Sequence, residues 1–317
     1  MVLATPLVAS EMGCVVTTIA VVAHSGKTFG GGLDELRATL AREGFADPVW
    51  YEVPKSRKAP TYAKRALRDG ADVVFVWGGD GTVQRCVDAL AGTDAVVAIL
   101  PAGTANLLAT NLGVPTDIEK AVRIGLHGER KLLDTGSVNG EHFTVMAGAG
   151  LDALMIKDAD GRLKDGVGRV AYLWTGAKNI GTRRVKVAIT VDGKDFFRGR
   201  ATCVLFGNVS KAFGGIKIFP RARPDDGILE VGVVTAKGLA EWARTVGRVA
   251  TGKPDKSPFV RTGRGTSVKV RFDRTTPYEL DGGARPATKT LKVKLHPRSI
   301  RVCVPPDSTV HRDSSAC

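Results

Sequence analysis

The chain has 317 residues, of which 25% are charged, and a chain of this length can hold two domains with sizeable cores. Residues 1–134 carry 14 Lys and Arg against 15 Asp and Glu, whereas residues 135–317 carry 32 against 17, so the excess of positive charge lies entirely in the second part. No apolar run reaches about 18 residues, and neither the five Cys nor the five His show zinc-site spacing, which disfavours a membrane-spanning protein, a metalloprotease and a His-based hydrolase.

The first residues predict a tail, a strand and a small polar loop. Met1–Cys14 lacks the basic start and the apolar core of a signal peptide, so we expect a loose tail there. Val15–Ala23 predicts the first strand, which leads into Ser25-Gly26-Lys27. This loop is similar to the end of a P-loop, but Val21 stands where a P-loop has its first Gly. The odd number of widely spaced Cys indicates free thiols and therefore a cytoplasmic protein.

Strands and helices alternate through the rest of the first part. Helical periodicity at 33–40, 62–67 and 118–126 alternates with short apolar strands at 49–53, 73–77 and 95–100. Such alternation is typical of βαβ units, so the fold class predicted for this part is a Rossmann-like α/β domain with a parallel sheet.

The strand Val73–Trp77 ends in a glycine-rich turn, Gly78-Gly79-Asp80-Gly81-Thr82, and a helical pattern follows. In an open α/β sheet, ligands bind where strands end and helices begin. Glycines there let the backbone approach a phosphate and point its N–H groups at it, and a carboxylate such as that of Asp80 can hold the Mg²⁺ that accompanies nucleotide phosphates. The alternative is a tight turn in which Asp80 only caps the helix.

A second polar turn follows the strand Ala95–Leu100 and reads Pro101-Ala102-Gly103-Thr104-Ala105-Asn106. Gly103 frees the backbone, and Thr104 and Asn106 offer a hydroxyl and an amide where a helix begins. Two adjacent strands that end in small polar turns form one continuous surface, made of residues 78–82 and 101–106, which we call the floor. Such a floor suits an extended polyanion better than an apolar ligand.

The pattern changes from Thr135 onward, where short strands separated by turns dominate. Two dipeptides, Asn139-Gly140 and Asp192-Gly193, are typical of hairpin turns, and strands are predicted at 143–147, 185–191, 201–206, 229–234, 268–272 and 291–295. Two helices interrupt them at 163–180 and 239–250, and the apolar face of the first either packs in the core or lines a cleft for acyl chains. We expect an antiparallel β-sandwich, in which the apolar loop at 213–219 is a candidate for membrane contact.

The two turns together resemble those of the diacylglycerol kinase catalytic-domain family, which includes bacterial lipid kinases and the sphingosine kinases. The shared motifs are Gly-Gly-Asp-Gly-Thr at 78–82 and Pro-x-Gly-Thr-x-Asn at 101–106, and weaker landmarks extend the likeness from about residue 17 to residue 304. NAD kinases and phosphofructokinases carry turns like the first one, so the combination at this spacing makes the likeness specific. The resemblance implies a nucleotide-binding domain of the NAD kinase or phosphofructokinase type at 17–134 and a β-sandwich lipid-substrate domain at 135–304, whose last strands could pack back on the first domain. The tails are then 1–16 and 305–317.

The resemblance also implies roles for individual residues. In the family, a Ser-Gly-Lys loop and both turns contact the nucleotide, which here implies Ser25, Gly26, Lys27, Gly78, Gly79, Asp80, Gly81, Thr82, Gly103, Thr104 and Asn106. The family has an acidic network around Mg²⁺, and the matching residues here are Asp80 and Asp134. Asp134 could equally be a strand-end residue in a turn. In the family an acidic residue deprotonates the lipid hydroxyl, and the resemblance assigns this role to Asp281. Bacterial members bind a structural Mg²⁺ at an Asp-Asp-Gly turn, which implies the Asp226 carboxylate with the carbonyl oxygens of Arg223 and Ile228.

This chain departs from the family at two acidic positions. Gly283 stands where the motif Asp-Gly-Glu has its Glu, and Leu107 stands where an Asp usually follows the second turn. Phosphoryl transfer depends mostly on positioning and charge neutralisation, with a carboxylate accepting the hydroxyl proton, and Asp281 can still fill that role. Two other functions remain open, namely a non-catalytic nucleotide- and lipid-binding protein and an NAD kinase-like kinase of a small molecule.

The sequence therefore predicts an ATP-dependent, Mg²⁺-using lipid kinase that moves the γ-phosphate to a hydroxyl of diacylglycerol or a similar lipid. The basic stretches lack interleaved aromatics and match no nucleic-acid module, so we expect an anionic membrane surface as the partner and no nucleic acid, with a merely solvated basic surface as the alternative. The expected location is the cytoplasm, peripherally at the inner face of the membrane. An exposed strand edge could pair two chains as a homodimer.

Overall fold

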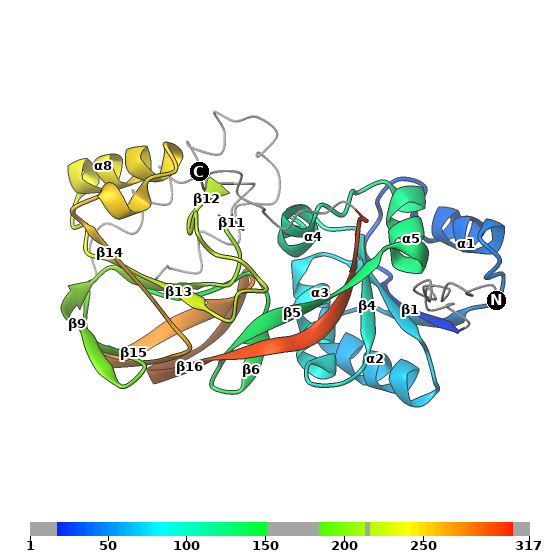
Figure 1. Ribbon diagram of the computed structural model, residues 1–317, viewed down its shortest axis with the longest axis horizontal. Coiled ribbons are helices and arrows are strands. Elements are labelled where there is room, and N and C mark those ends of the chain that lie inside the picture. The colour runs from blue at the N-terminus through cyan, green and yellow to red at the C-terminus, as the bar shows by residue number, and fades with distance from the viewer. Residues whose placement is uncertain (1–17, 151–183, 213–215, 307–317) are drawn as a thin grey trace, which may run out of the picture.

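The computed structural model describes residues 18–150, 184–212 and 216–306. It shows two lobes that are joined by two long strands (Figure 1). The predicted helix at 163–180, most of both tails and the first residues of the apolar loop at 213–219 lie outside the described residues. No helix in the described part of the chain is long and apolar enough to cross a membrane.

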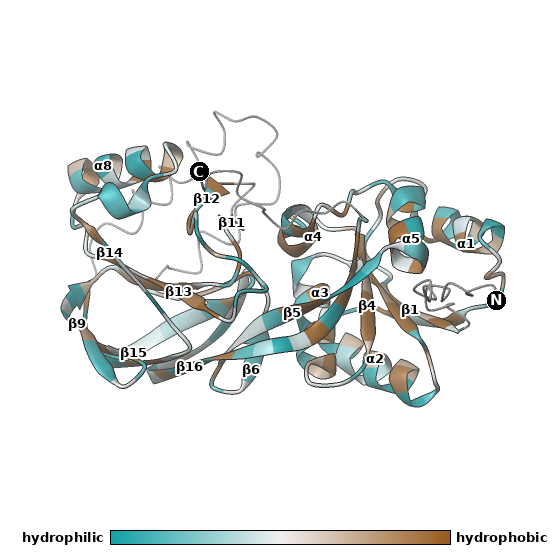
Figure 2. Ribbon diagram, in the orientation of Figure 1, coloured by the Kyte–Doolittle hydropathy of each residue, from teal (hydrophilic) through white to brown (hydrophobic). Residues whose placement is uncertain are grey.

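The first lobe is a parallel sheet with helices on its faces, as predicted (Figure 1). The strand order is β2-β1-β3-β4, and the buried residues of these strands form the larger hydrophobic core. The strands appear as brown ribbons between teal-striped helices in Figure 2, because buried parallel strands are apolar throughout whereas the helices are amphipathic. The elements are β1 (Ile19–His24), α1 (Gly32–Arg42), β2 (Val49–Val53), η1 (Ser56–Lys58), α2 (Ala59–Arg68), β3 (Val73–Gly78), α3 (Asp80–Leu90), β4 (Val96–Pro101), α4 (Leu107–Leu112) and α5 (Ile118–His127).

The second lobe is an antiparallel sandwich with its own core, which confirms the predicted fold class. The Asn139-Gly140 and Asp192-Gly193 hairpins form as predicted, and all four residues have the positive φ that tight two-residue hairpin turns require. The predicted helix at 239–250 is α8, whose apolar side covers a small third core. The elements are β5 (Glu129–Val138), β6 (Glu141–Phe143), β7 (Met146–Ala149), β8 (Val185–Val191), β9 (Lys194–Ala201), β10 (Cys203–Gly207), β11 (Lys211–Ala212), β12 (Ile216–Lys217), β13 (Leu229–Val234), α8 (Leu239–Ala250), η3 (Pro254–Lys256), β14 (Val260–Gly265), β15 (Ser267–Leu280) and β16 (Gly283–Val304).

Strands β5 and β16 belong to both lobes, and Figure 1 shows them running across the gap between the two bodies. The first half of β16 pairs with β15 in the sandwich, and its end pairs in parallel with β4 of the first sheet at Arg301↔Val96 and Val302↔Val97. The antiparallel pairing of β5 with β16 is interrupted between His296 and Ile300. The pairing of the two strands that join the lobes is therefore irregular at this point.

The strand predicted at 143–147 is wrong in one respect, because the structure breaks it into β6 and β7. The break falls at Thr144 and Val145, whose backbone N–H groups point at the carboxylate of Asp281 instead of at a neighbouring strand. A side chain 136 positions later in the chain has replaced a strand partner at this point. Local patterning could not reveal that acceptor.

Candidate active site

The two glycine-rich turns lie against each other at the carboxyl ends of β3 and β4. The parallel register runs from Val73↔Val96 to Gly78↔Pro101, so both strands end together. A side chain on Gly103 would collide with the Cα of Gly79, so the two backbones can approach this closely only because both residues lack one. The structure thus brings together the two turns that the sequence predicted as one floor.

The second turn is held in shape by Asn106, which is buried and adopts a left-handed φ of 46°. Its Oδ1 accepts a hydrogen bond from the Gly103 N–H, and its Nδ2 donates to the Gly103 carbonyl, both at 2.8 Å. The side chain therefore closes the turn on itself. The neighbouring Thr104 and Gly81 are exposed and border the same floor.

Asp80 is the first residue of α3 and connects the two turns. Its Oδ1 accepts a hydrogen bond of 2.5 Å from the backbone N–H of Leu107, the first residue of α4. Burial raises the pKa of Asp80 to about 6, the Leu107 N–H opposes that shift, and the negative charge of Asp281 adds to it. Asp80 from the first lobe and Asp281 from the second are thus close enough to interact.

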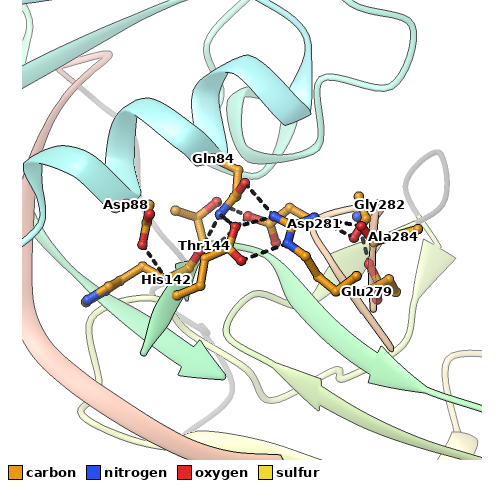
Figure 3. Close-up of polar contacts among 11 residues, drawn as sticks. Gln84, Asp88, His142, Thr144, Glu279, Asp281, Gly282 and Ala284 are labelled. Carbon is orange, nitrogen blue, oxygen red and sulfur yellow. Dashed lines mark hydrogen bonds and ion pairs between the residues drawn. The ribbon is translucent and has the colours of Figure 1, made fainter. Parts of the chain in front are cut away.

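Asp281 lies in the two-residue turn between β15 and β16, and its carboxylate is completely hydrogen-bonded (Figure 3). Oδ2 accepts from the N–H and the hydroxyl of Thr144, each at 2.8 Å, and Oδ1 accepts from the N–H groups of Val145 and Met146, each at 2.9 Å. Burial raises the pKa of Asp281, and these four hydrogen bonds oppose that shift. Each carboxylate oxygen has two lone pairs, so no acceptor position remains for a further proton donor.

Glu279 lies two residues before Asp281 on β15 and was missed by sequence reasoning. It is only 5% exposed, and its Oε2 accepts a hydrogen bond of 2.8 Å from the Gly282 N–H. Its Oε1 is buried and has no hydrogen-bond partner in the described structure. Burial, followed by the charge of Asp281, raises the pKa of Glu279 to about 8, and Arg285 opposes the shift.

Arg285 joins the hairpin of β15 and β16 to helix α3 and was also not predicted. Its guanidinium forms a two-point ion pair with Glu141, with Nε 2.7 Å from Oε2, and its Nη2 donates to the Gln84 side-chain oxygen at 3.2 Å. Nη1 donates to the carbonyl of Gly283 at 2.9 Å. A Cβ on Gly283 would lie 2.7 Å from Nη1, so the guanidinium fills the space where a side chain at 283 would begin.

The Ser25–Lys27 loop lies beside the end of β3, because the indole N–H of Trp77 donates to the Lys27 carbonyl at 3.0 Å. All three of its backbone N–H groups already have partners, since Ser25 donates to the Val53 carbonyl, Gly26 to the His24 ring and Lys27 to the His24 carbonyl. The Ser25 hydroxyl also donates to the Val53 carbonyl, at 3.4 Å. Among the proposed nucleotide contacts of this loop, the Lys27 side chain is therefore better available than the backbone.

Thr82 is buried directly behind the first turn. It is 1% exposed, and its hydroxyl shares a hydrogen bond of 2.9 Å with the hydroxyl of Ser56. A Cβ on Gly78 would collide with the Thr82 side chain, so this threonine packs against the strand end. In this arrangement its hydroxyl supports the turn from behind.

Asp134 is buried at the irregular stretch between β5 and β16. One carboxylate oxygen accepts from the Gly227 N–H and the other from the Arg298 N–H, both at 2.7 Å. The backbone N–H of Asp134 donates to Pro224, so the residue ties the Asp-Asp-Gly turn to β16. Its two carboxylate oxygens are therefore engaged with backbone N–H groups at the junction of the lobes.

Asp226, predicted to hold a structural Mg²⁺, lies beside a guanidinium. Its Oδ1 accepts from the Ile228 N–H at 3.1 Å, and its Oδ2 pairs with Nη2 of Arg264 at 2.8 Å. Nε of Arg264 lies 2.8 Å from the buried Oε1 of Glu230, an ion pair without hydrogen-bond alignment. The positive charge of Arg264 at this carboxylate opposes a second cation, so the residues present do not suit the structural metal.

A catalytic Mg²⁺ suits the residues better at Asp80, whose carboxylate is half-buried beside the exposed floor. The described residues hold no group of three or more His, Cys, Asp and Glu that could bind a metal by themselves. Mg²⁺ in phosphotransferases is typically held by one or two carboxylates together with substrate phosphates, which is the donor set that Asp80 and a nucleotide would supply.

A cavity of about 770 Å³ lies at the other end of the first sheet. Its lining includes Ala71 and Val96, at the amino ends of β3 and β4, and the basic side chains of Arg130 and Arg298. Ligands of open α/β sheets bind at the carboxyl ends of the strands, so this cavity is separate from the floor.

Comparison with known proteins places both lobes in one family. Residues 19–138 match the diacylglycerol kinase catalytic domain, and residues 145–304 match the YegS C-terminal NAD kinase beta sandwich-like domain. A "Diacylglycerol kinase" of Staphylococcus carnosus (strain TM300) is 30% identical over 280 residues, which cover 87% of this chain and 90% of the relative. The chain belongs to the diacylglycerol kinase catalytic-domain family. A "Probable lipid kinase YegS-like" of Enterobacter sp. (strain 638) is 29% identical over 260 residues, which cover 80% of this chain and 85% of the relative.

Solved structures of similar proteins share this two-lobe fold. A diacylglycerol kinase from Bacillus anthracis str. Sterne aligns with a TM-score of 0.71 at 22% identity, covering 92% of this chain and 98% of that one. An NAD kinase from Archaeoglobus fulgidus in complex with ATP aligns with a TM-score of 0.52 at 13% identity, covering 90% of this chain and 93% of that one. Family membership makes this chain a nucleotide-binding phosphotransferase that uses ATP.

Proposed function

We propose that this chain transfers the γ-phosphate of ATP to a hydroxyl of diacylglycerol or a similar lipid at an anionic membrane surface. The observation that carries the proposal is the meeting of the two lobes at Asp80. The glycine turns of the first lobe offer a floor for phosphates. The hairpin of the second lobe that carries Asp281 is tied to helix α3, because its Arg285 donates to Gln84 one turn beyond Asp80. Phosphoryl transfer needs such positioning and charge neutralisation more than covalent chemistry.

In this proposal, backbone N–H groups around Gly79 and Gly103 would receive the phosphates, together with the exposed Thr104 and the positive end of helix α3. Asp80 would hold the Mg²⁺ of the nucleotide, and the ion when bound would neutralise the charge that develops on the transferred group. The hairpin that carries Asp281 would form the acceptor side of the site. Asp134 would fix the angle between the lobes through its contacts with the turn at 224–227 and with β16.

Support for an anionic partner comes from one face of the sandwich. Directly paired residues of an antiparallel sheet point to the same side, and so do residues two apart along a strand. The registers of β9, β8, β15 and β16 therefore gather seven exposed cations on one face, namely Lys186, Arg198, Arg200, Lys269, Arg271, Lys292 and Lys294. Each basic side chain near anionic lipid contributes roughly 1 kcal/mol to attraction. This face would dock the protein on the membrane.

The test is a phosphorylation assay with radiolabelled ATP on extracted lipids in anionic vesicles, with the labelled product identified by mass. We expect a labelled lipid with the wild type, and transfer reduced at least about 100-fold with Asp80→Asn. Asp94→Asn is the matched control, because its carboxylate is 95% exposed just before the amino end of β4, at the opposite end of the sheet from the turns. Undiminished transfer by Asp80→Asn would contradict the site assignment.

Two outcomes would overturn the proposed function itself. A labelled water-soluble product would indicate a kinase of a small molecule, as in the NAD kinases that share the fold. Binding of ATP and vesicles without transfer to any lipid would indicate a non-catalytic lipid-binding protein.

The docking surface is tested by charge reversal of Lys269, Arg271 and Lys292 to Glu. This variant is expected to be released from anionic vesicles while ATP binding persists. Retention on the vesicles would exclude the basic face as the docking surface.

A further inference from the structure

The acid that receives the lipid hydroxyl proton must have a free lone pair, and Asp281 offers none. All four acceptor positions of its carboxylate are occupied, three of them by backbone N–H groups that shape the break between β6 and β7. Moving this carboxylate toward a substrate would leave those buried N–H groups unpaired, which is costly. Asp281 is therefore built as an anchor for the hairpin.

Glu279 has the property that Asp281 lacks. Its side chain is 95% buried, given an exposure of 5%, yet Oε1 has no hydrogen-bond partner in the described structure. Its other oxygen is fixed by the Gly282 N–H, which orients the carboxyl group within the same hairpin (Figure 3). Native proteins rarely leave a buried carboxyl oxygen unpaired, so this position points to a group that arrives from outside the chain.

We propose that Glu279 is the catalytic base that accepts the proton of the lipid hydroxyl, which compensates for the Glu missing at Gly283. This inference rests on the proposed lipid kinase function. The hydroxyl proton passes to Glu279 Oε1 as the hydroxyl oxygen forms a bond to the γ-phosphorus. The bond between the γ-phosphorus and the β,γ-bridging oxygen breaks, and ADP leaves with that electron pair.

The electrostatic surroundings of Glu279 agree with such a role. Burial and the neighbouring Asp281 raise the pKa of Glu279 to about 8. A carboxylate of this basicity accepts a proton more readily than an ordinary exposed Glu, and general bases work best when their pKa lies near the working pH. Arg285 limits the shift from the other side, so the group still ionises in the neutral range.

The test compares Glu279→Gln with Glu119→Gln, a control on the exposed surface of α5, in the lipid phosphorylation assay. Gln keeps the acceptor for the Gly282 N–H but cannot take up a proton. We expect Glu279→Gln to lower the turnover number about 100-fold or more, with the affinity for ATP within about twofold of wild type. The wild-type rate is expected to rise with pH through about 8, and this rise is absent in the variant.

Each outcome bears on a different claim. Wild-type turnover and an unchanged pH profile in Glu279→Gln would show that Glu279 is structural and overturn this inference. If the variant does not fold, the wild-type profile decides alone, because a rate that is flat from about pH 6 to about pH 10 excludes a base of this pKa. Absence of transfer by the wild type to every lipid tested would remove the proposed function, and this inference with it.

Discussion

Replacing the ionisable carboxyl group of Glu279 by an amide, in Glu279→Gln, is expected to stabilise the protein in a pH-dependent way. Between pH 4.5 and about 8 the folded state holds a proton on Glu279 that the unfolded state has lost. Stability therefore falls as the pH rises through this window, because the folded state binds more protons than the unfolded state. The variant Glu279→Gln keeps the shape of the side chain but cannot ionise, so its stability does not fall with pH for this reason.

The size of the effect follows from the pKa shift. Each pKa unit corresponds to about 1.4 kcal/mol, so the rise from 4.5 to about 8 amounts to about 5 kcal/mol once both states have ionised. At pH 7 the unfolded state has titrated about 2.5 units past its own pKa while the folded state is still mostly protonated, which gives about 3 kcal/mol. Below about pH 4 the wild type and the variant should be equally stable.

Urea unfolding at pH 5, 7 and 9 measures this difference directly, with Glu119→Gln as the exposed control. The variant is expected to gain on the wild type from each pH to the next, while the control follows the wild type throughout. The pKa of Asp80 is also raised, to about 6, but that shift is common to all three proteins and cancels in the comparison. A difference that is the same at all three values, or a variant less stable than the wild type at each of them, would refute the buried, neutral Glu279 on which the reasoning depends.

Three further predictions concern the turns, the Asp-Asp-Gly turn and the junction of the lobes. Gly103→Ala is expected to cost about 2 kcal/mol of unfolding free energy through its collision with the facing turn, whereas Gly81→Ala, whose Cβ meets nothing, is neutral or stabilising. Arg264→Met is expected to cost about 2 kcal/mol by leaving the buried Glu230 and the half-buried Asp226 without their cation, and chelation of metal leaves the wild-type thermal midpoint unchanged. The adjacent, mutually tilted rings of His142 and His296 both have pKa values lowered by burial, so the stability present above pH 6.5 is lost as the pH falls through those lowered values, and His296→Gln reduces this acid sensitivity.

Three results would contradict these expectations. Equal stability of both alanine variants would mean that the backbones at the two turns can separate without cost. A thermal midpoint that drops on chelation would indicate a bound metal near Asp226 despite the guanidinium. An unchanged acid profile in His296→Gln would show that the histidine pair does not control stability at low pH.

The first lobe could be predicted from sequence because its signals are local. The pattern of buried apolar residues distinguishes strands from helices within windows of about ten residues, and each glycine-rich turn follows its own strand directly. Their proximity then follows from the parallel pairing of β3 with β4. The hairpins of the second lobe were predictable for the same reason, since Asn-Gly and Asp-Gly specify their turns without outside help.

The electrostatic contacts could not be predicted, because their partners are distant in the sequence. The Asp134 carboxylate binds backbone at Gly227 and Arg298, 93 and 164 positions away, so its anchoring of the junction leaves no local signal. Arg264 reaches Asp226 across 38 positions. Glu279 is adjacent to a recognised motif, yet only the fold shows that one of its oxygens is buried without a partner.

The absence of an acid at position 283 and the presence of a link between the lobes are parts of one arrangement. Gly283 leaves room for the guanidinium of Arg285, which a side chain at 283 would displace. That guanidinium binds Glu141 and Gln84, and Gln84 lies one turn beyond Asp80 on the same helix. The hairpin on the acceptor side is thereby attached to the helix on the nucleotide side. A glycine at 283 therefore removes one negative charge from the site. Through Arg285, it also fixes the hairpin of β15 and β16 against helix α3.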